Sequence, residues 1–249
     1  MDRLSAFFDA FPLEVHVPAC VGTGWTSAHE GPKLYLLGDA SGRLTQVVLH
    51  VRGAAAPADA LMVVDVSFGG SDNPLLGTLP DALHLPVEDD RTGVGNLARA
   101  FIDEWSSARC GHRHALHRLG EVIVLMVLRA AIERGSTRPC LLAGLAHPLL
   151  HRVLVALHES PAHPWTVEEL AQIAGLSRSH FMALFPKVVG ATPMSYLTKW
   201  RVRLGQRELR RANIKVKAVA RRVGFASAEA FSRAYQREFG RPPVDDMRV

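Results

Sequence analysis

Cysteine is scarce in this chain, and long apolar runs are missing. The 249 residues include three scattered cysteines, Cys20, Cys110 and Cys140. Three are too few for a disulfide framework, which favours a reducing compartment, the cytoplasm. Residues 1–12 lack the basic start and apolar core of a signal peptide. The longest apolar stretch, Val122 to Leu128, predicts a buried helix, because a membrane span needs about 20 apolar residues.

Motifs of catalysis are also missing. The sequence contains no nucleophile elbow and no phosphate-binding loop, and three cysteines exclude a four-cysteine zinc site. Cys110, His114 and His117 would share one face of a helix, but Gly111 interrupts that helix and no fourth ligand is evident. We therefore expect a surface cluster there rather than a metal site, and neither a cofactor nor enzymatic activity.

Acidic residues are few in the C-terminal part. Residues 147–249 hold 17 Lys and Arg against 8 Asp and Glu, whereas residues 1–146 hold 12 against 16. A basic region beside an acidic one is typical of a polyanion-binding module joined to a second domain. We predict two domains, 1–146 and 147–249, with nucleic acid as the partner of the second.

The basic region contains one pattern written twice. Small, aromatic and turn-forming residues recur in the same order about fifty residues later, which marks a duplicated supersecondary unit. The first copy is Ala171, Gly175, Phe181, Phe185, Gly190 and Pro193, and the second is Ala220, Gly224, Phe231, Tyr235, Gly240 and Pro243.

Each copy has the signature of a helix-turn-helix. Thr166, with Glu169 at capping-box spacing, begins a short helix that Gly175 ends. A second helix follows, with two aromatic residues one turn apart on its buried side. Two helices joined by a short glycine-containing turn make a helix-turn-helix. An ordinary helical hairpin is the alternative, which the coincident basic charge disfavours.

A long helix is expected between the two copies. It begins at Pro193 and runs for roughly 18 residues to Arg211, a length of about 27 Å. With a turn at each end, it would set two recognition helices near one DNA turn apart, about 34 Å. One chain would then reach two successive major grooves.

The N-terminal part has a different character. Residues 1 to about 90 alternate short β-favouring runs with turn residues, which predicts an antiparallel sheet, a partial barrel or a sandwich. Two helices are expected next, over 96–108 and 114–133, with apolar faces that belong in a core or at a subunit interface. The predicted fold class is therefore α+β, with a β-rich domain and helical connector before an all-α domain. The β-favouring runs are Lys33–Leu37, Thr45–Val51 and Leu61–Val66.

About 100 residues of the basic region resemble the DNA-binding domain of the AraC family of bacterial transcription regulators. The resemblance implies a sequence-specific regulator that binds double-stranded DNA. It also implies a homodimer formed through the N-terminal domain and the helices over 96–134, and RNA polymerase as a further partner. The matching stretches are Trp165–Ala171, Gly190–Arg201, Val219–Phe225 and Phe231–Pro243.

The N-terminal half resembles the cupin-type sensor domain of a subgroup of that family. The features are residues 1–8, Cys20 with Gly24 and Trp25 close behind, and Leu79–Pro86. In some such regulators the early cysteine senses oxidants, including reactive chlorine, which makes Cys20 the candidate redox sensor. A small buried hydrophobic side chain is the alternative for Cys20. No histidine set of a catalytic metal cupin is present.

The predicted DNA contacts lie at the starts and on the exposed faces of the two recognition helices. Arg can pair with guanine and Gln with adenine, and each good pair gives about 1–3 kcal/mol of discrimination. A solvated helix surface is the alternative for each residue. The candidates are Ser177, Arg178, Ser179, His180, Lys187, Ser227, Glu229, Ser232, Arg233, Gln236 and Arg237.

The first recognition helix departs from the family pattern. Ala183 and Pro186 stand where relatives usually carry basic residues, and Pro186 is expected to end or kink the helix near Phe185. Our main hypothesis is a regulator with two DNA-reading units, controlled by a small effector or by oxidation of Cys20. A weakened or repurposed regulator with a structural first unit remains an alternative, as does, less favoured, a cupin-type enzyme or ligand-binding protein.

Overall fold

The chain forms two compact units in the computed structural model, which describes residues 3–17, 31–52, 56–70, 73, 75–77, 79–87, 93–107, 109–135, 139–211 and 214–247. The sheet unit is Phe11–Gly135. The helical unit combines Met1–Ala10 with Ser136–Val249. No helix in these ranges is long and apolar enough to cross a membrane.

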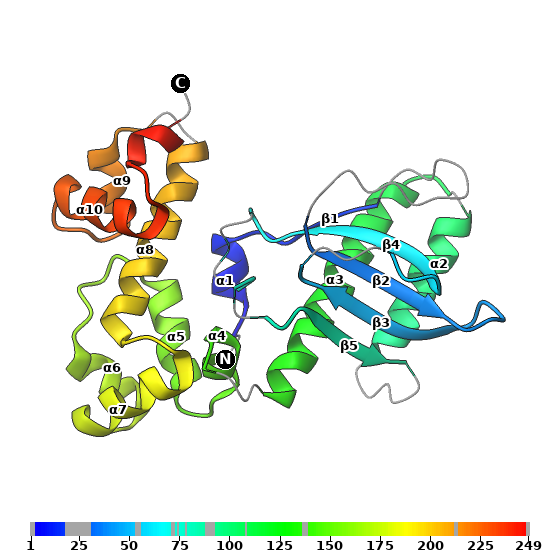
Figure 1. Ribbon diagram of the computed structural model, residues 1–249, viewed down its shortest axis with the longest axis horizontal. Helices are drawn as coiled ribbons and strands as arrows, with labels where there is room; N and C mark the ends of the chain where they lie inside the picture. Colours follow the sequence, from blue (N-terminus) through cyan, green and yellow to red (C-terminus); the bar gives the residue numbers. More distant parts are fainter. Residues whose placement is uncertain are drawn as a thin grey trace. The chain divides into compact units, whose positions relative to one another are not determined.

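Five antiparallel strands form the sheet unit, in the order β1-β4-β2-β3-β5 (Figure 1). In the register of the central strands, Lys33 lies opposite both His50 of β3 and Asp65 of β4. The three predicted β-runs are strands, and two shorter strands flank them. The strands are β1 (Glu14–His16), β2 (Lys33–Gly38), β3 (Leu44–His50), β4 (Ala60–Ser67) and β5 (Ala82–Pro86).

Both faces of the central strands are buried. Leu34, Tyr35 and Leu36 follow one another along β2 and point to alternate faces, yet all three are 0% exposed. A strand covered on both sides has a continuous apolar sequence rather than an alternating one. The runs of leucine and valine in β2, β3 and β4 follow from this.

Two helices cover one face of the sheet. They are α2 (Val94–Ser107) and α3 (His112–Arg134), which pack on each other and contact β1, β3 and β5 (Figure 1). Leu116, Ile123 and Val127 place the buried side of α3 on the sheet. Arg134 Nη1 donates to the carbonyl of His84 (2.8 Å), which fastens the end of α3 to β5.

The helical unit contains the predicted duplication. Its long central helix α8 passes from the group formed by α4 to α7 to the group formed by α9 and α10 (Figure 1). The predicted α+β class, a β-rich part followed by an all-helical part, is confirmed. The helices are α1 (Ser5–Ala10), α4 (Leu141–Ala146), α5 (Leu150–Glu159), α6 (Val167–Ala174), α7 (Arg178–Val189), α8 (Pro193–Arg211), α9 (Val216–Arg222), α10 (Ala228–Phe239) and the 3-10 helix η1 (Pro243–Asp246).

The first ten residues belong to the helical unit, whereas the sequence predicts a single domain over 1–146. Phe7 of α1 is 0% exposed, with its ring centroid 5.5 Å from that of Trp200 and 5.9 Å from that of His158. Arg207 Nη1 donates to the carbonyl of Asp9 (3.0 Å), and Arg3 Nη1 donates to that of Leu145 (3.0 Å). The division between the units falls after Ala10 and after Gly135, because Phe7 finds its apolar contacts among the C-terminal helices.

Candidate nucleic-acid interface

The first helix-turn-helix consists of α6, a tight turn and α7. The Thr166 hydroxyl accepts from the Glu169 backbone N–H (3.2 Å), while the Glu169 carboxylate accepts from the Thr166 N–H (2.8 Å). This is the predicted capping box. Gly175 ends α6 with φ of 68°, a left-handed conformation that favours glycine. Phe181 and Phe185 of α7 are 0% exposed and fix its orientation.

The second helix-turn-helix repeats this plan with α9 and α10. Phe231 and Tyr235, both 0% exposed, take the places of the two phenylalanines. Gly224, with φ of 88°, stands at the turn. A Cβ added to Gly224 would lie 2.7 Å from Cα of Ala162 in the α5–α6 loop. The turn of the second unit therefore packs directly on the backbone of the first half.

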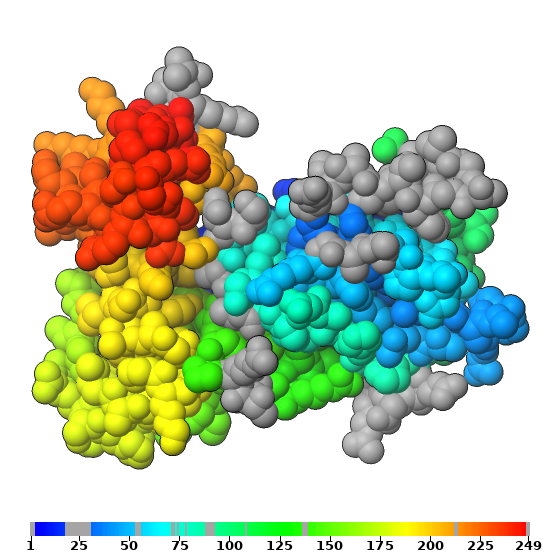
Figure 2. All heavy atoms as spheres, in the orientation of Figure 1, coloured from blue at the N-terminus to red at the C-terminus, as the bar shows by residue number. Residues whose placement is uncertain are grey.

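The predicted DNA contacts gather on the surfaces of α7 and α10. Of the eleven residues, ten are exposed and Ser232 is half-buried. They occupy the beginning of α7 with Lys187 further along, and the beginning and outer side of α10. The two units lie at the same edge of the helical unit, yellow-green and orange at the left of Figure 2.

The serines at the starts of these helices also have a structural role, in addition to the predicted DNA contact. The Ser177 hydroxyl accepts from the His180 N–H (3.3 Å), and the Ser227 hydroxyl accepts from the Ala230 N–H (3.1 Å). Both serines are therefore N-caps. Glu229 lies next to the second cap. Hydrogen bonds from the Glu229 backbone N–H and from the Ser227 side chain lower the pKa of the Glu229 carboxyl. Glu229 thus carries a negative charge beside Arg233.

Arg178 is exposed but paired. Its Nε lies 2.6 Å from Oε1 of Glu168 on α6, and both side chains face solvent. An exposed ion pair is worth only about 0–1 kcal/mol. Arg178 can therefore exchange Glu168 for a phosphate at little cost.

Pro186 does not end α7, so that part of the prediction is wrong. The helix runs without a break from Arg178 to Val189, with Pro186 inside it. A single proline removes one helical hydrogen bond. The turn beyond it is held by buried Val189, by the Gly190 N–H donating to the Pro186 carbonyl (2.9 Å) and by the Cys140 N–H donating to the Val188 carbonyl (3.0 Å).

The arginines of α8 mostly bind the protein itself. Arg201 joins the helix to the α5–α6 loop, since Nε donates to the Pro161 carbonyl (2.6 Å) and Nη2 to the His163 carbonyl (2.8 Å). Arg203 Nη2 lies 2.7 Å from Oε1 of Glu238 on α10. Through Arg201 and Arg203, α8 is therefore bonded to both helix-turn-helix halves.

Asp246, for which the sequence predicts no role, accepts hydrogen bonds from four side chains. Its carboxylate accepts from the Tyr235 hydroxyl, from Arg210 Nε (2.8 Å), from Gln206 Nε2 (3.2 Å) and from Arg241 Nε (3.1 Å). Burial raises the pKa of Asp246, but the hydrogen bonds from Tyr235, Arg210 and Gln206 outweigh it and lower the pKa to about 2. Asp246 thus holds η1, α8 and α10 together.

His158 of α5 was also missed. It is 5% exposed and stacks on Trp200 with ring centroids 4.1 Å apart. Its Nε2 shares a 2.6 Å hydrogen bond with the Tyr196 hydroxyl, and Nδ1 has no hydrogen-bond partner among the described residues. Burial lowers the pKa of His158 to about 3, so the ring is neutral near pH 7.

Neither of the two described cysteines is among the predicted DNA contacts. Cys20, the redox candidate, lies outside the described residues. Cys110 is exposed and lies two residues before α3 begins. Cys140 is buried, and its Sγ accepts from the Ala143 N–H (3.4 Å) at the start of α4. In the described ranges, no three His, Cys, Asp or Glu side chains are grouped as a metal site would require.

Two family models match the chain. One, described as a helix-turn-helix domain, matches residues 170–248. The other, described as a cupin, matches residues 14–133. The first therefore falls on both helix-turn-helix units and the second on the sheet with α2 and α3.

Several transcription regulators are similar in sequence. The RCS-specific HTH-type transcriptional activator RclR of Escherichia coli is 40% identical over 171 residues, 68% of this chain and 60% of the relative. An AraC-like transcription regulator of Streptomyces lividans is 36% identical over 173 residues, 69% of this chain and 57% of the relative. The regulator AlkR of Acinetobacter baylyi is 32% identical over 185 residues, which are 72% of this chain and 59% of the relative. The chain thus spans about three fifths of the length of these relatives.

Among solved structures, the DNA-binding domain of AdpA in complex with a target DNA is 31% identical, with a TM-score of 0.38. The alignment covers 40% of this chain and 89% of that domain.

Proposed function

Because this chain belongs to the AraC family of helix-turn-helix transcription regulators with an N-terminal cupin domain, we propose that it regulates transcription by binding specific DNA sequences. The family is one of regulators and not of enzymes. The observation that carries the proposal is the pair of capped helices α7 and α10, each with exposed polar and basic side chains.

Both units serve the proposed function through α8. This helix has 19 residues and is therefore about 28 Å long. With the turns at each end, this length supports two recognition helices spaced for successive major grooves, about 34 Å apart. Arg201 and Arg203 bond α8 to both halves, so the spacing is set by the protein before DNA binds.

The second unit carries most of the base recognition in this proposal. Arg233, Gln236 and Arg237 are exposed on α10 and have the side chains that pair with guanine and adenine. The start of α7, from Ser177 to His180, binds phosphates through its N–H groups and hydroxyls, and Lys187 adds one charge. In the alternative function, α7 is structural and the second unit alone reads DNA.

The sheet unit is the proposed sensor and dimerisation module. Val122 of α3 is 43% exposed, an apolar side chain on the helix that also covers the sheet. Two copies of the chain would pair through this unit, and RNA polymerase would be a partner at the promoter. The protein would have two conformations that differ in DNA affinity. A small effector would bind one of them more tightly, or oxidation of Cys20 would stabilise one of them over the other. As a regulator it would work in the cytoplasm.

The test is genome-wide selection of binding sites with the purified full chain at fixed salt, reduced and mildly oxidised. Two half-elements about ten base pairs apart support two reading units, because one helical turn separates successive major grooves. A single short element supports the alternative, and no enrichment overturns the function. Oxidation of the wild type, but not of Cys20→Ser, is expected to change the selected set.

The variant Arg233→Ala tests whether Arg233 contacts a base of the selected DNA sites. We expect about 10-fold weaker binding, near 1.4 kcal/mol, and relaxed preference at one base position. Arg43→Ala removes the same charge from an exposed turn of the sheet unit and serves as the control. Unchanged selectivity of Arg233→Ala across operator variants contradicts its role.

A further inference from the structure

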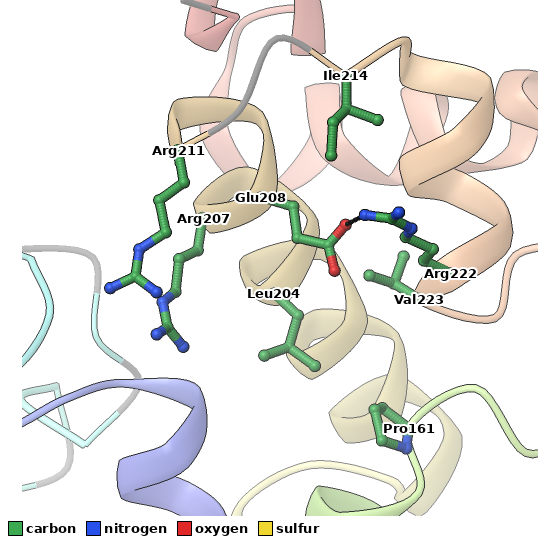
Figure 3. A pocket seen from close by; sticks show the side chains of 8 residues that line it. All are labelled: Pro161, Leu204, Arg207, Glu208, Arg211, Ile214, Arg222 and Val223. Carbon is green, nitrogen blue, oxygen red and sulfur yellow. Dashed lines mark ion pairs between the residues drawn. The ribbon is translucent and has the colours of Figure 1, made fainter.

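A cavity of about 370 Å³ lies in the helical unit between α8, α9 and the α5–α6 loop (Figure 3). This volume falls within the range of small-molecule sites, about 300–1,000 Å³. The eight residues that line it are Pro161, Leu204, Arg207, Glu208, Arg211, Ile214, Arg222 and Val223. None of them is among the DNA contacts proposed above.

The walls of the cavity are apolar and its ends are charged. Leu204 lies in the middle, with Ile214 at one side and Pro161 at the other (Figure 3). Leu204 and Ile214 are partly buried against the core of the second helix-turn-helix, so they are held in place. The charged groups are three arginines against one glutamate, which gives the lining a net positive charge.

Two of the arginines stand together at one end. Arg207 and Arg211 are one turn apart on α8, and their guanidinium groups point the same way (Figure 3). Burial, and after it the positive charge of Arg211, lower the pKa of Arg207. In the described part of the chain no acidic side chain forms an ion pair with Arg211. An anion between these two groups would relieve their repulsion.

A long ion pair between Arg222 and Glu208 lies at the opposite end of the cavity. Arg222 Nη1 and Glu208 Oε2 are 3.6 Å apart, an ion pair too long for a hydrogen bond. Glu208 Oε2 is buried and has no hydrogen-bond partner among the described residues. This end therefore contains a polar atom that a donor on a bound molecule would satisfy.

We propose that this cavity binds a small carboxylate with an apolar body. The carboxylate lies between Arg207 and Arg211, which offer charge-assisted hydrogen bonds in the planar geometry that carboxylates match. The apolar body lies against Leu204, Ile214 and Pro161 and displaces water from their surfaces.

The site is placed to act on DNA binding, a consequence that rests on the proposed function. Its walls come from both halves of the module, since Pro161 precedes the first helix-turn-helix and Arg222 ends α9 of the second. Arg207 also donates to the Asp9 carbonyl of α1. A carboxylate that draws Arg207 toward the cavity would compete with this bond.

The test uses 2-naphthoate and its neutral isostere 2-naphthamide, titrated calorimetrically into the full chain. We expect the full chain to bind 2-naphthoate at least 10-fold more tightly than 2-naphthamide. Arg211→Glu is expected to weaken 2-naphthoate binding at least 10-fold. Arg221→Glu makes the same charge change at an exposed position of α9 outside the cavity lining, and should alter the affinity less than two-fold.

Three outcomes overturn the site. They are no 2-naphthoate binding, equal affinity for the acid and the amide, and equal losses in Arg211→Glu and Arg221→Glu. DNA affinity is measured separately with and without 2-naphthoate. If DNA binding fails while the titrations follow the expected pattern, the carboxylate site stands and the proposed function falls. If DNA binds but 2-naphthoate does not, the reverse holds.

Discussion

The two helix-turn-helix units have the same core and different surfaces. Phe181 and Phe185 in the first correspond to Phe231 and Tyr235 in the second, and all four are fully buried. The outer faces differ in part: exposed Ala183 corresponds to Arg233 and half-buried Pro186 to exposed Gln236, whereas Lys187 and Arg237 are both exposed and basic. The two copies thus share their buried aromatic residues and differ at two of these three outer positions.

The two units also differ in how they are held. The first relies on its capping box and on the buried cluster of Phe7, His158 and Trp200. The second is closed by the polar centre at Asp246 and by the contact of Gly224 with the preceding loop. Substitutions at matched positions should therefore have unequal effects.

The largest difference is expected at the two turn glycines. Alanine at either position costs about 1–2 kcal/mol because of the left-handed backbone. Gly224→Ala adds a 2.7 Å approach to the Ala162 backbone, whereas a Cβ at Gly175 meets nothing within 4 Å. We expect Gly224→Ala to cost about 2–5 kcal/mol in total, since overpacking adds about 1–3. Urea unfolding of the two variants checks this, and equal midpoints would contradict the packing described for Gly224.

The next effect is expected at Asp246. Asp246→Asn should lower the free energy of unfolding by about 2 kcal/mol near pH 7, since it weakens hydrogen bonds to a charged acceptor. The folded pKa of Asp246, about 2, lies below its ordinary value of 3.8. Its contribution is therefore complete above about pH 4 and is lost as the pH falls through 2. Exposed Asp245→Asn is the control, and a loss as large in that variant would argue against a special role for Asp246.

His158 gives a pH-dependent effect of about the same size in the first unit. Its folded pKa of about 3 lies below the ordinary 6.5, so below pH 6.5 the unfolded state binds a proton that the folded state does not. Stability should fall as the pH drops, by about 2 kcal/mol at pH 5 relative to pH 7. His158→Gln, which cannot be protonated, should flatten this part of the curve, while exposed His114→Gln should not. Superimposable pH profiles of wild type and His158→Gln would refute the assignment.

The smallest effect is expected from a charge added to the exposed face of α7. Ala183→Arg should tighten DNA binding a few-fold at moderate salt, because an added phosphate contact releases a counterion. The slope of log affinity against log salt should steepen by about 0.9. Ala183→Gln has a long polar side chain without charge and is the control. An unaltered salt slope in Ala183→Arg would mean that this face of α7 does not meet the DNA backbone.

Local signals explain why the helix-turn-helix units could be predicted. Capping boxes, turn glycines and aromatic pairs act over three or four residues, so Thr166, Gly175 and Phe181 appear in the sequence at the spacing that the structure uses. The central strands were found for the same reason, since each is a continuous apolar run. β1, with three residues, is too short to give such a signal.

Contacts between distant residues could not be predicted. Arg207 meets Asp9 across 198 positions of sequence, and Arg201, Gln206 and Arg210 find their partners 36 to 40 positions away. Their residue types are ordinary for an exposed helix. Pro186 is the opposite case. A proline usually ends a helix, but α7 continues past it because Val189 is buried and the last turn is held by backbone hydrogen bonds. The DNA-contact residues themselves stay a prediction, since their surface position is compatible with either a reader or a solvated face.

The packing of α1 changes what counts as a separable piece of this protein. In the order of the chain, residues 11–135 are an insertion within a module that starts with α1 and resumes at Ser136. A protease cut between residues 135 and 139 would therefore leave two fragments joined through Phe7, not two free domains. The chain therefore passes between the two units twice, once after Ala10 and once after Gly135.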